Sequence, residues 1–378
     1  MILANATIVD ENFKLVNCDI RIDGERITEI GTHLSGEEVL DMSGKYILPG
    51  LIDIHIHGAN GARIGEGDWD LAPITRLEAT QGVTGIAITT GTPTFESLLQ
   101  QLECAAAAAQ KQPQGSKILG VHAEGPFLSP KRKGAAQEEN IHMPDIKKLE
   151  CMIAHGKGFL KIITVAPEMP GATELIAYAA ANGLVVSMGH TDATMEQALA
   201  GIRAGATHST HTFNAMRPLN HREPSVVGAA LLAPEVTCEM ICDYVHLHPA
   251  TIELIYRLKG ADRIIMISDS GHAAGVKISE FEVNGIKRYI KDGVVRLEDG
   301  TIAGSAKTLL DGVQNLLHAG IPMTDVAKMA SYNPAKSLKL DALMGSIAIG
   351  KCADLLVLDK DYNVEYTFIN GACAYKKE

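Results

Sequence analysis

Two histidines close an early apolar run of the sequence. The run Tyr46–Ile52 contains a Pro-Gly corner and β-branched residues, so it predicts a buried strand that continues through His55 and His57. Successive side chains of a strand alternate in direction, so these two imidazoles point to the same side. Neutral imidazole nitrogens directed together suit a zinc, iron or nickel ion. Taken alone, the pair is also typical of hydrogen-bonded histidines in a polar cleft.

Residues of ligand and acid–base types follow several later apolar runs. Glu124 closes the third predicted strand, His190 the fifth and His211 the sixth. The seventh strand leads to His246, and the eighth ends at Asp269. If the strands are parallel, their carboxyl ends meet at one edge and gather these side chains. The sequence therefore predicts one site built from strand ends, because unrelated structural roles would scatter such residues over helices and loops.

The elements that must position this site alternate between apolar strands and amphipathic helices. Eight such units predict an α/β fold, a (β/α)8 TIM-like barrel over residues 51–345. Residues 281–304, which carry the turn signals Asn284-Gly285, Asp292-Gly293 and Asp299-Gly300, predict a β-hairpin insertion near the end of this barrel. The predicted strands are Leu51–His57, Val83–Thr89, Lys117–Ala123, Leu160–Val165, Leu184–Gly189, Ala206–His211, Thr237–Cys242 and Ile264–Ser268.

Both ends of the chain have a different pattern. Residues 1–50 and 346–378 consist of short β-like runs separated by turn signals such as Asp23-Gly24 and Asn370-Gly371. A hairpin is rarely stable alone, so we expect both termini to pair into one small β-sandwich domain.

Composition narrows the class of protein. The chain has 378 residues, 46% of them hydrophobic, and a formal charge of −11, which argues against nonspecific binding to nucleic acid or to an anionic membrane. Its seven cysteines are scattered without a CxxC pair, as in reduced cytoplasmic proteins. The N-terminus lacks the pattern of an export signal, and no apolar run reaches membrane-spanning length. We therefore expect a cytoplasmic enzyme or scaffold without a membrane anchor.

Several motifs together resemble the amidohydrolase superfamily, and within it the family of N-acetylglucosamine-6-phosphate deacetylases. Glu-Gly-Pro-Phe and His-x-Phe-Asn-Ala-Met are more diagnostic than the His-x-His pair, which many amidohydrolases share. The matching segments, in order along the chain, are residues 49–58, 122–127, 189–191, 210–216, 222–224 and 267–269.

The resemblance implies a divalent metal bound by Glu124, His190 and His211. It implies a second metal at His55 and His57, since both histidines are retained, with Zn²⁺ or Fe²⁺ as the expected ions. A metal lowers the pKa of bound water and polarises a carbonyl, which an acetamide needs before it can be hydrolysed.

The resemblance also implies roles for residues around the metals. Asp269 matches the acid–base aspartate, and His246 matches the histidine beside the scissile amide. The expected substrate contacts are Asn214, Ala215, Arg222, His246 and Ala135, with Arg222 reaching the sugar phosphate from the neighbouring subunit of a homodimer.

The chain departs from the family pattern at two places. Ala135-Ala136-Gln137 stands where the family often has a phosphate-binding histidine, so that contact must be absent or replaced. His272 is an added imidazole near Asp269, either a substrate contact or a loop residue facing solvent. The basic run 131–133 is either a solvated lid surface or a phosphate contact.

The resemblance implies metal-dependent hydrolysis of N-acetyl-D-glucosamine 6-phosphate to D-glucosamine 6-phosphate and acetate, in amino-sugar catabolism. The galactosamine epimer or another N-acylated amine is the nearest alternative, because one inverted hydroxyl can be read by a single side chain. A noncatalytic barrel that serves as a scaffold is a third reading. Such a protein typically loses its ligands, whereas this chain keeps them.

Overall fold

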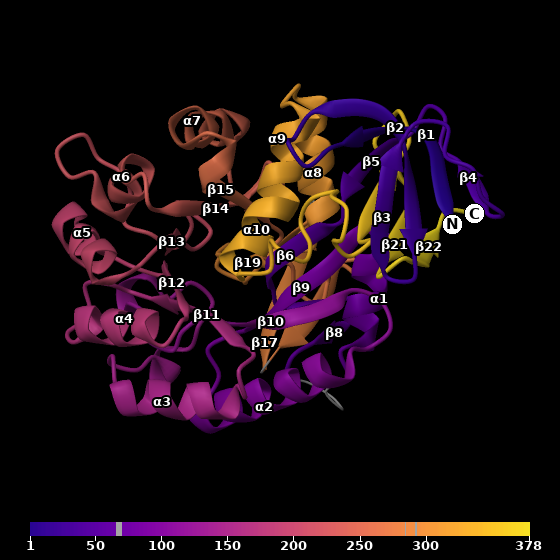
Figure 1. Cartoon of the computed structure of the whole chain (residues 1–378). Coiled ribbons are helices and arrows are strands. Elements are labelled where there is room, and N and C mark those ends of the chain that lie inside the picture. Colours follow the sequence, from indigo (N-terminus) through magenta and orange to yellow (C-terminus); the bar gives the residue numbers. More distant parts are fainter. Residues whose placement is uncertain (66–69, 284, 292) are drawn as a thin grey trace.

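A closed barrel of parallel strands forms the centre of the molecule (Figure 1). The computed structural model describes residues 1–65, 70–283, 285–291 and 293–378. Within these ranges eight strands neighbour one another in chain order, and the barrel closes where Ile56 pairs with Ser270. The predicted (β/α)8 fold is therefore confirmed. The strands are β6 Leu51–Ile56, β9 Val83–Thr90, β10 Lys117–Ala123, β11 Leu160–Val165, β12 Val185–Met188, β13 His208–Ser209, β14 Thr237–Ile241 and β15 Ile264–Ile267.

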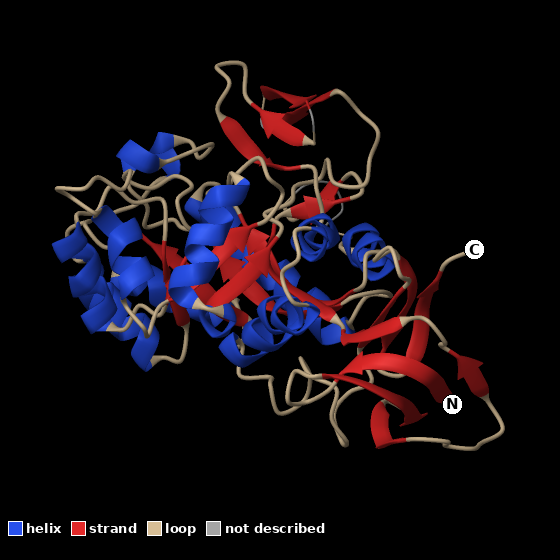
Figure 2. Cartoon of the chain, turned by 90° about the horizontal axis from the view of Figure 1, so that it is seen from above, coloured by secondary structure: helices blue, strands red, loops and turns tan. Residues whose placement is uncertain are grey.

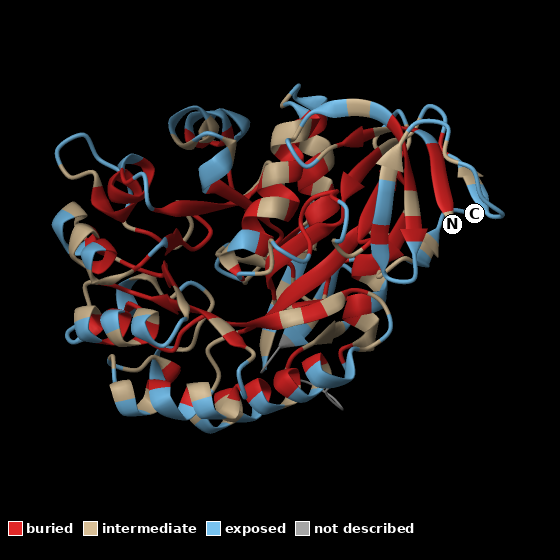
Figure 3. Cartoon of the chain, in the orientation of Figure 1, coloured by how far each residue is buried: buried red, intermediate tan, exposed pale blue. Residues whose placement is uncertain are grey.

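Helices surround the barrel and bury their apolar faces against it (Figures 2 and 3). Local sequence starts several of them: Thr94 accepts a hydrogen bond from Ser97 N at the start of α2, and Thr194 and Gln197 form a capping box at α5. The α-helices of the described ranges are α1 Ala72–Thr80, α2 Phe95–Lys111, α3 Ile146–His155, α4 Ala172–Ala181, α5 Met195–Ala204, α6 Ser225–Leu232, α7 Pro249–Lys259, α8 Leu309–His318, α9 Met323–Ala327 and α10 Asn333–Ser337. None of these helices is long and apolar enough to cross a membrane.

The sixth barrel strand is shorter than the sequence predicts. The apolar pattern indicates a strand over 206–211, but β13 contains only His208–Ser209. His211 has a φ of 33°, a left-handed conformation that a regular strand does not contain. Pairing therefore ends before this residue, and the backbone turns towards the mouth of the barrel.

Both termini build one further sheet beside the barrel, at the right of Figure 1. It combines parallel and antiparallel pairs around its own core, which includes Leu3, Ile20 and Phe368. Lys117 Nζ lies 2.5 Å from Asp354 Oδ2 and so links the first residue of β10 to this sheet. Its strands are β1 Ile2–Val9, β2 Leu15–Asp23, β3 Arg26–Gly31, β4 Val39–Asp41, β5 Tyr46–Pro49, β20 Leu355–Leu358, β21 Val364–Ile369 and β22 Ala372–Lys376.

The insertion after the last barrel strand is larger than the predicted hairpin. Four antiparallel strands follow one another here, because the segment contains several turns rather than one. Two of the predicted turn residues, Asn284 and Asp292, lie outside the described residues. The sheet stands apart from the helices in Figure 2. Its strands are β16 Glu280–Val283, β17 Ile286–Lys291, β18 Val294–Arg296 and β19 Ile302–Ser305.

Candidate metal and active site

Glu124, His190 and His211 converge at the carboxyl ends of β10, β12 and β13. Glu124 Oε1 lies 3.1 Å from His190 Nε2 and 3.1 Å from His211 Nε2. The two imidazole nitrogens are themselves 3.1 Å apart. Residues separated by 66 and 87 positions in the chain thus place three ligand atoms around one point.

Three of the proposed ligand and acid–base residues have left-handed backbone conformations. The φ angles are 47° at His190, 33° at His211 and 49° at Asp269, a region that non-glycine residues rarely occupy. Such conformations cost on the order of 1–3 kcal/mol each and persist where the surrounding structure holds them. Here they redirect three side chains from the ends of their strands into the mouth of the barrel.

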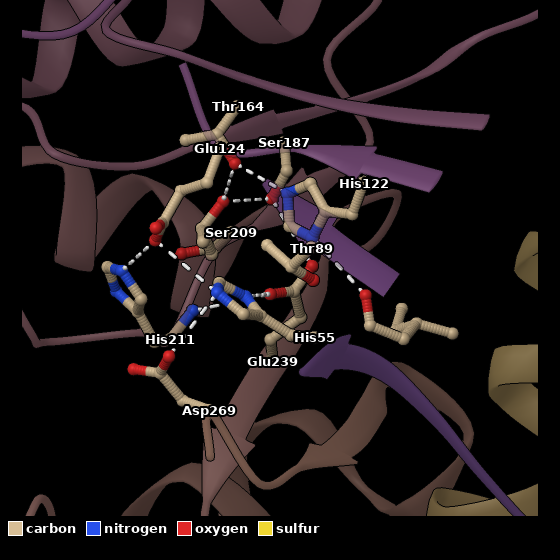
Figure 4. Close-up of polar contacts among 12 residues, drawn as sticks. His55, Thr89, His122, Glu124, Thr164, Ser187, Ser209, His211, Glu239 and Asp269 are labelled. Carbon is tan, nitrogen blue, oxygen red and sulfur yellow. Dashed lines mark hydrogen bonds and ion pairs between the residues drawn. The ribbon is translucent and has the colours of Figure 1, made fainter. Parts of the chain in front are cut away.

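A second group lies beside the first, at the seam where β6 and β15 meet (Figure 4). His57 Nε2 is 3.3 Å from Asp269 Oδ1, and His55 Nε2 is 3.5 Å from the same oxygen. Glu124 reaches both groups, because its Oε1 is 3.4 Å from His55 Nε2 and its Oε2 is 3.3 Å from His57 Nε2. The Glu124 carboxylate therefore lies between two sets of potential ligands.

The donor atoms fit divalent metals. His190 Nδ1 lies 2.9 Å from the carbonyl oxygen of Arg132, which cannot donate, so Nδ1 carries a proton and donates it. In the neutral ring Nε2 is then a lone-pair acceptor that faces the carboxylate of Glu124. A neutral Nε2 and a carboxylate oxygen 3.1 Å apart are both acceptors, and a cation held between them would satisfy both. Imidazole and carboxylate ligands in this number are those that zinc and iron sites use.

The carboxylates of the site are held in their ionised form. Burial alone would raise the pKa of Glu124, but the nearby His55 and His190 outweigh it and hold this pKa well below its ordinary value. The pKa of Asp269 is likewise lowered, because His55 and His57 outweigh the effect of burial. Both groups are therefore available as ligands or as a base at neutral pH.

His246 lies in the loop after β14 and is oriented by Asp243. Its Nδ1 is 2.7 Å from Asp243 Oδ2, and its backbone N–H donates to Asp243 Oδ1 at 2.9 Å. Burial acts to lower the pKa of His246, but the hydrogen bond to Asp243 outweighs it and raises the pKa. The far side of the ring, with Nε2, is left to face the cavity.

One cavity of about 870 Å³ joins these side chains. Its lining brings together many of the residues that the sequence predicts. Two predicted residues are not in the lining. His55 is fully buried below it, and Arg222 is exposed on the loop before α6. The predicted site residues in the lining are His57, Glu124, Ala135, His190, His211, Asn214, Ala215, His246 and Asp269.

The two departures from the family pattern also face this cavity. Ala136 and Gln137 line it, and so does the basic run 131–133, within which Arg132 pairs with Asp192 at 2.8 Å. His272 lies in the lining too, with its ring edge against Phe281 of β16 at a centroid distance of 3.8 Å. The added imidazole is thus at the cavity wall rather than on a remote loop.

Residues 46–373 match the profile of the amidohydrolase family. The chain belongs to this family. An N-acetylglucosamine-6-phosphate deacetylase of Lysinibacillus sphaericus is 34% identical over 98% of this chain and 97% of its own length. One from Vibrio furnissii is 36% identical over 87% and 83%.

A solved structure of an N-acetyl-D-glucosamine-6-phosphate deacetylase is also similar to this chain. The N-acetyl-D-glucosamine-6-phosphate deacetylase of Mycobacterium smegmatis, a mutant in complex with N-acetyl-D-glucosamine 6-phosphate, superposes with a TM-score of 0.93 at 31% identity. The match covers 100% of this chain and 99% of that one. The amidohydrolase family implies a divalent metal, and this chain has two groups of residues that can hold one.

Sequence reasoning missed a buried polar layer beneath this amidohydrolase site. Glu239 on β14 and His122 on β10 are both fully buried, and both contact the side chain of His55. His122 Nε2 lies 2.8 Å from Thr164 Oγ1, and burial lowers the pKa of His122 to about 3, so its ring is neutral. A charged residue in the middle of an apolar strand was the available signal for Glu239.

Proposed function

We propose that this protein removes the acetyl group of N-acetyl-D-glucosamine 6-phosphate, giving D-glucosamine 6-phosphate and acetate, in amino-sugar catabolism. The observation that carries this function is the convergence of four histidines and Glu124 with Asp269, beside the cavity that His246 also lines. Relatives that cover nearly the whole chain are deacetylases of this substrate. An N-acetylgalactosamine-6-phosphate deacetylase of Escherichia coli O157:H7 is 32% identical over 89% of the chain. Its identity is below the 34% and 36% of the two N-acetylglucosamine-6-phosphate deacetylases described above, so the epimer is not favoured.

Two divalent metals, Zn²⁺ or Fe²⁺, are part of this proposal. Glu124, His190 and His211 would hold one ion, and His55 with His57 would hold the second. The close approach of histidine Nε2 atoms to carboxylate oxygens supports this assignment. When bound, such ions lower the pKa of water towards about 7 and polarise the carbonyl of the amide.

Asp269 and His246 are the proposed catalytic residues. The Asp269 carboxylate is ionised and faces the ligand group, so it can accept a proton from the attacking water and return it to the leaving nitrogen. His246, with Nδ1–H held by Asp243, presents Nε2 to the cavity, where the protonated ring can donate to the carbonyl oxygen. Asn214 Nδ2 donates to His211 O at 3.2 Å, which fixes the loop that carries Asn214 and Ala215.

The proposed phosphate contact involves a second copy of the chain. Arg222 is exposed and outside its own cavity, which is what a residue serving the partner's site would show. A guanidinium offers two parallel hydrogen bonds to a phosphate, and the bound phosphate then holds the amide in place. We therefore propose a homodimer in which Arg222 crosses the interface and Ala135 borders the sugar.

We place the reaction in the cytoplasm. All seven cysteines are free thiols, and two of them, Cys151 and Cys373, are exposed, which fits a reducing compartment.

A substrate panel tests the function. Acetate release is measured with the 6-phosphates of N-acetylglucosamine and N-acetylgalactosamine and with both unphosphorylated sugars. The proposal expects the highest kcat/KM for N-acetylglucosamine 6-phosphate. Higher kcat/KM for the galactosamine epimer would reassign the substrate, and no acetate release from any sugar in the metal-loaded protein would overturn the function.

A further inference from the structure

A third carboxylate lies directly beneath the two ligand groups. Glu239 points into the barrel from the middle of β14 and is fully buried (Figure 4). Its Oε2 lies 3.4 Å from His55 Nδ1 and 3.4 Å from the backbone nitrogen of His211. Its Oε1 is 3.5 Å from Ser187 Oγ. One carboxylate thus touches a histidine of one group and the backbone of a histidine of the other.

His55 faces carboxylates on both sides of its ring. Nε2 lies 3.4 Å from Glu124 Oε1 and 3.5 Å from Asp269 Oδ1, whereas Nδ1 faces only Glu239 among these carboxylates. With Glu239 removed, the two carboxylates on the Nε2 side would favour a proton on Nε2. That tautomer cannot ligate a metal through Nε2, because the lone pair is then used by the proton. The choice of tautomer therefore depends on an anion at Nδ1.

We propose that Glu239 is a positioning residue that holds the Nδ1–H of His55, so that Nε2 presents its lone pair to a metal, and that it ties this ligand to the backbone of His211. The proposal deepens the function given above and rests on its assignment of His55 as a ligand. Carboxylate partners of ligating histidines fix the ring and its tautomer, and their loss typically weakens metal binding by about 10- to 100-fold.

Glu239 also contacts the backbone of His211, a proposed ligand of the other ion. The His211 nitrogen donates to Glu239 Oε2 while its backbone is in the left-handed conformation that directs the ring to Glu124. By contrast, His190 is oriented by a main-chain oxygen, that of Arg132, which no side-chain substitution removes. Glu239→Gln keeps a side-chain oxygen that can accept from the His211 nitrogen but loses the anion at His55 Nδ1. This substitution should consequently weaken binding of the ion at His55 and leave the ion at His190 and His211 largely in place.

Zn²⁺ titration of the metal-free protein, in competition with a chromophoric chelator, tests the proposal without substrate. Glu239→Gln should weaken the binding of one of the two Zn²⁺ ions by about 10- to 100-fold. In a His55→Asn background the same change should alter Zn²⁺ affinity less than about 2-fold, because the partner it positions is gone. Ser187→Ala is the matched control, since it alters the same buried layer without touching His55, and it should bind both ions as the unsubstituted protein does.

Equal weakening in both backgrounds, or of both ions, would overturn the proposal in favour of a general structural role. Should Glu239→Gln fail to fold, ¹⁵N spectra of histidine-labelled, Zn²⁺-loaded protein decide the question, with His55 assigned by its absence from His55→Asn. A proton on Nδ1 supports the proposal, and a proton on Nε2 refutes it. Since neither test uses substrate, both can fail while deacetylation stands. Loss of deacetylation with normal Zn²⁺ binding would instead affect only the proposed function.

Discussion

The carboxylate of Asp269 lies 3.3 Å from His57 Nε2, across the seam that joins the first and last strands of the barrel. Asp269 N donates to His55 O at 2.9 Å across the same seam, and His57 N donates to Ser270 O at 2.8 Å. The proposed acid–base residue and one proposed ligand pair are therefore fixed to each other by the backbone. Closure of the barrel itself sets their geometry.

Removal of Glu124 should abolish metal binding at the first group. Its two oxygens contact four histidines, so Glu124→Ala takes an anionic ligand from both groups, whereas His55→Asn with His57→Asn should empty only the second. Elemental analysis of dialysed protein measures the metal content per chain. Glu150→Ala, an exposed carboxylate on α3, is the control. Unchanged metal content in Glu124→Ala would contradict the assignment.

Loss of Arg222 should affect only phosphorylated substrate. A hydrogen bond to a charged group contributes about 2 kcal/mol, so Arg222→Ala should lower kcat/KM for the 6-phosphate by roughly 30-fold and leave the unphosphorylated sugar nearly unchanged. Arg203→Ala, on the exposed end of α5, serves as the control. Equal losses with both sugars would indicate a structural role, and a fully active monomer on sizing would exclude the contact across an interface.

Asp243 should act through His246. Asp243→Asn replaces the anion that holds Nδ1–H by a neutral amide, so the ring loses both its fixed orientation and the raised pKa. We expect kcat to fall by up to about 10²-fold, near the lower range for loss of one oxyanion donor, with KM little changed. The kcat of His246→Asn sets the largest loss that Asp243→Asn can cause if Asp243 acts only through His246. A double variant slower than either single variant by the product of both effects would show that the two residues act independently.

The strand ends were predictable because parallel strands buried on both faces give continuous apolar runs, and the residue after each run stands out. Bounds for β10 and β11 agree with those predicted, and Glu124 follows β10 directly. The left-handed turns at His190 and Asp269 could not be predicted, since neither residue type requires such a conformation.

Contacts between residues far apart in the chain could not be predicted from the sequence, for a different reason. Glu239 touches His55, which lies 184 positions away, and no local pattern pairs the two. The basic run 131–133 is typical of a solvated loop, yet it faces the cavity because Arg132 pairs with Asp192 after β12. Only the closed barrel brings these segments together.

Glu78 should destabilise the protein at neutral pH. It is fully buried on α1, and within the described residues neither of its carboxyl oxygens has a hydrogen-bond partner. Burial, and then the charges of Asp53 and Asp311, raise its pKa well above the ordinary value of 4.5. Because the folded pKa is the higher one, the contribution of Glu78 to stability is most favourable below pH 4.5 and is lost as pH rises through the folded pKa.

Glu78→Met should therefore raise the free energy of unfolding at pH 8, by roughly 1–3 kcal/mol, and raise it less at pH 5. Urea titrations at both pH values measure the difference. The exposed Glu103→Met on α2 should show little dependence on pH. An equal gain for Glu78→Met at pH 5 and pH 8 would argue against a protonated buried carboxyl.

Steady-state kinetics of Asp269→Asn at verified metal content test the account most directly. Asn keeps the shape of the side chain but cannot accept and return a proton, so the variant should keep its fold, the metal at the Glu124 group and its affinity for N-acetyl-D-glucosamine 6-phosphate. Its kcat should fall by at least the roughly 10²- to 10⁴-fold that general acid–base catalysis contributes. If the variant instead loses bound metal, or if its melting temperature falls, Asp269 is a ligand or a structural residue. A near-normal kcat in fully metallated Asp269→Asn protein would contradict the proposed mechanism.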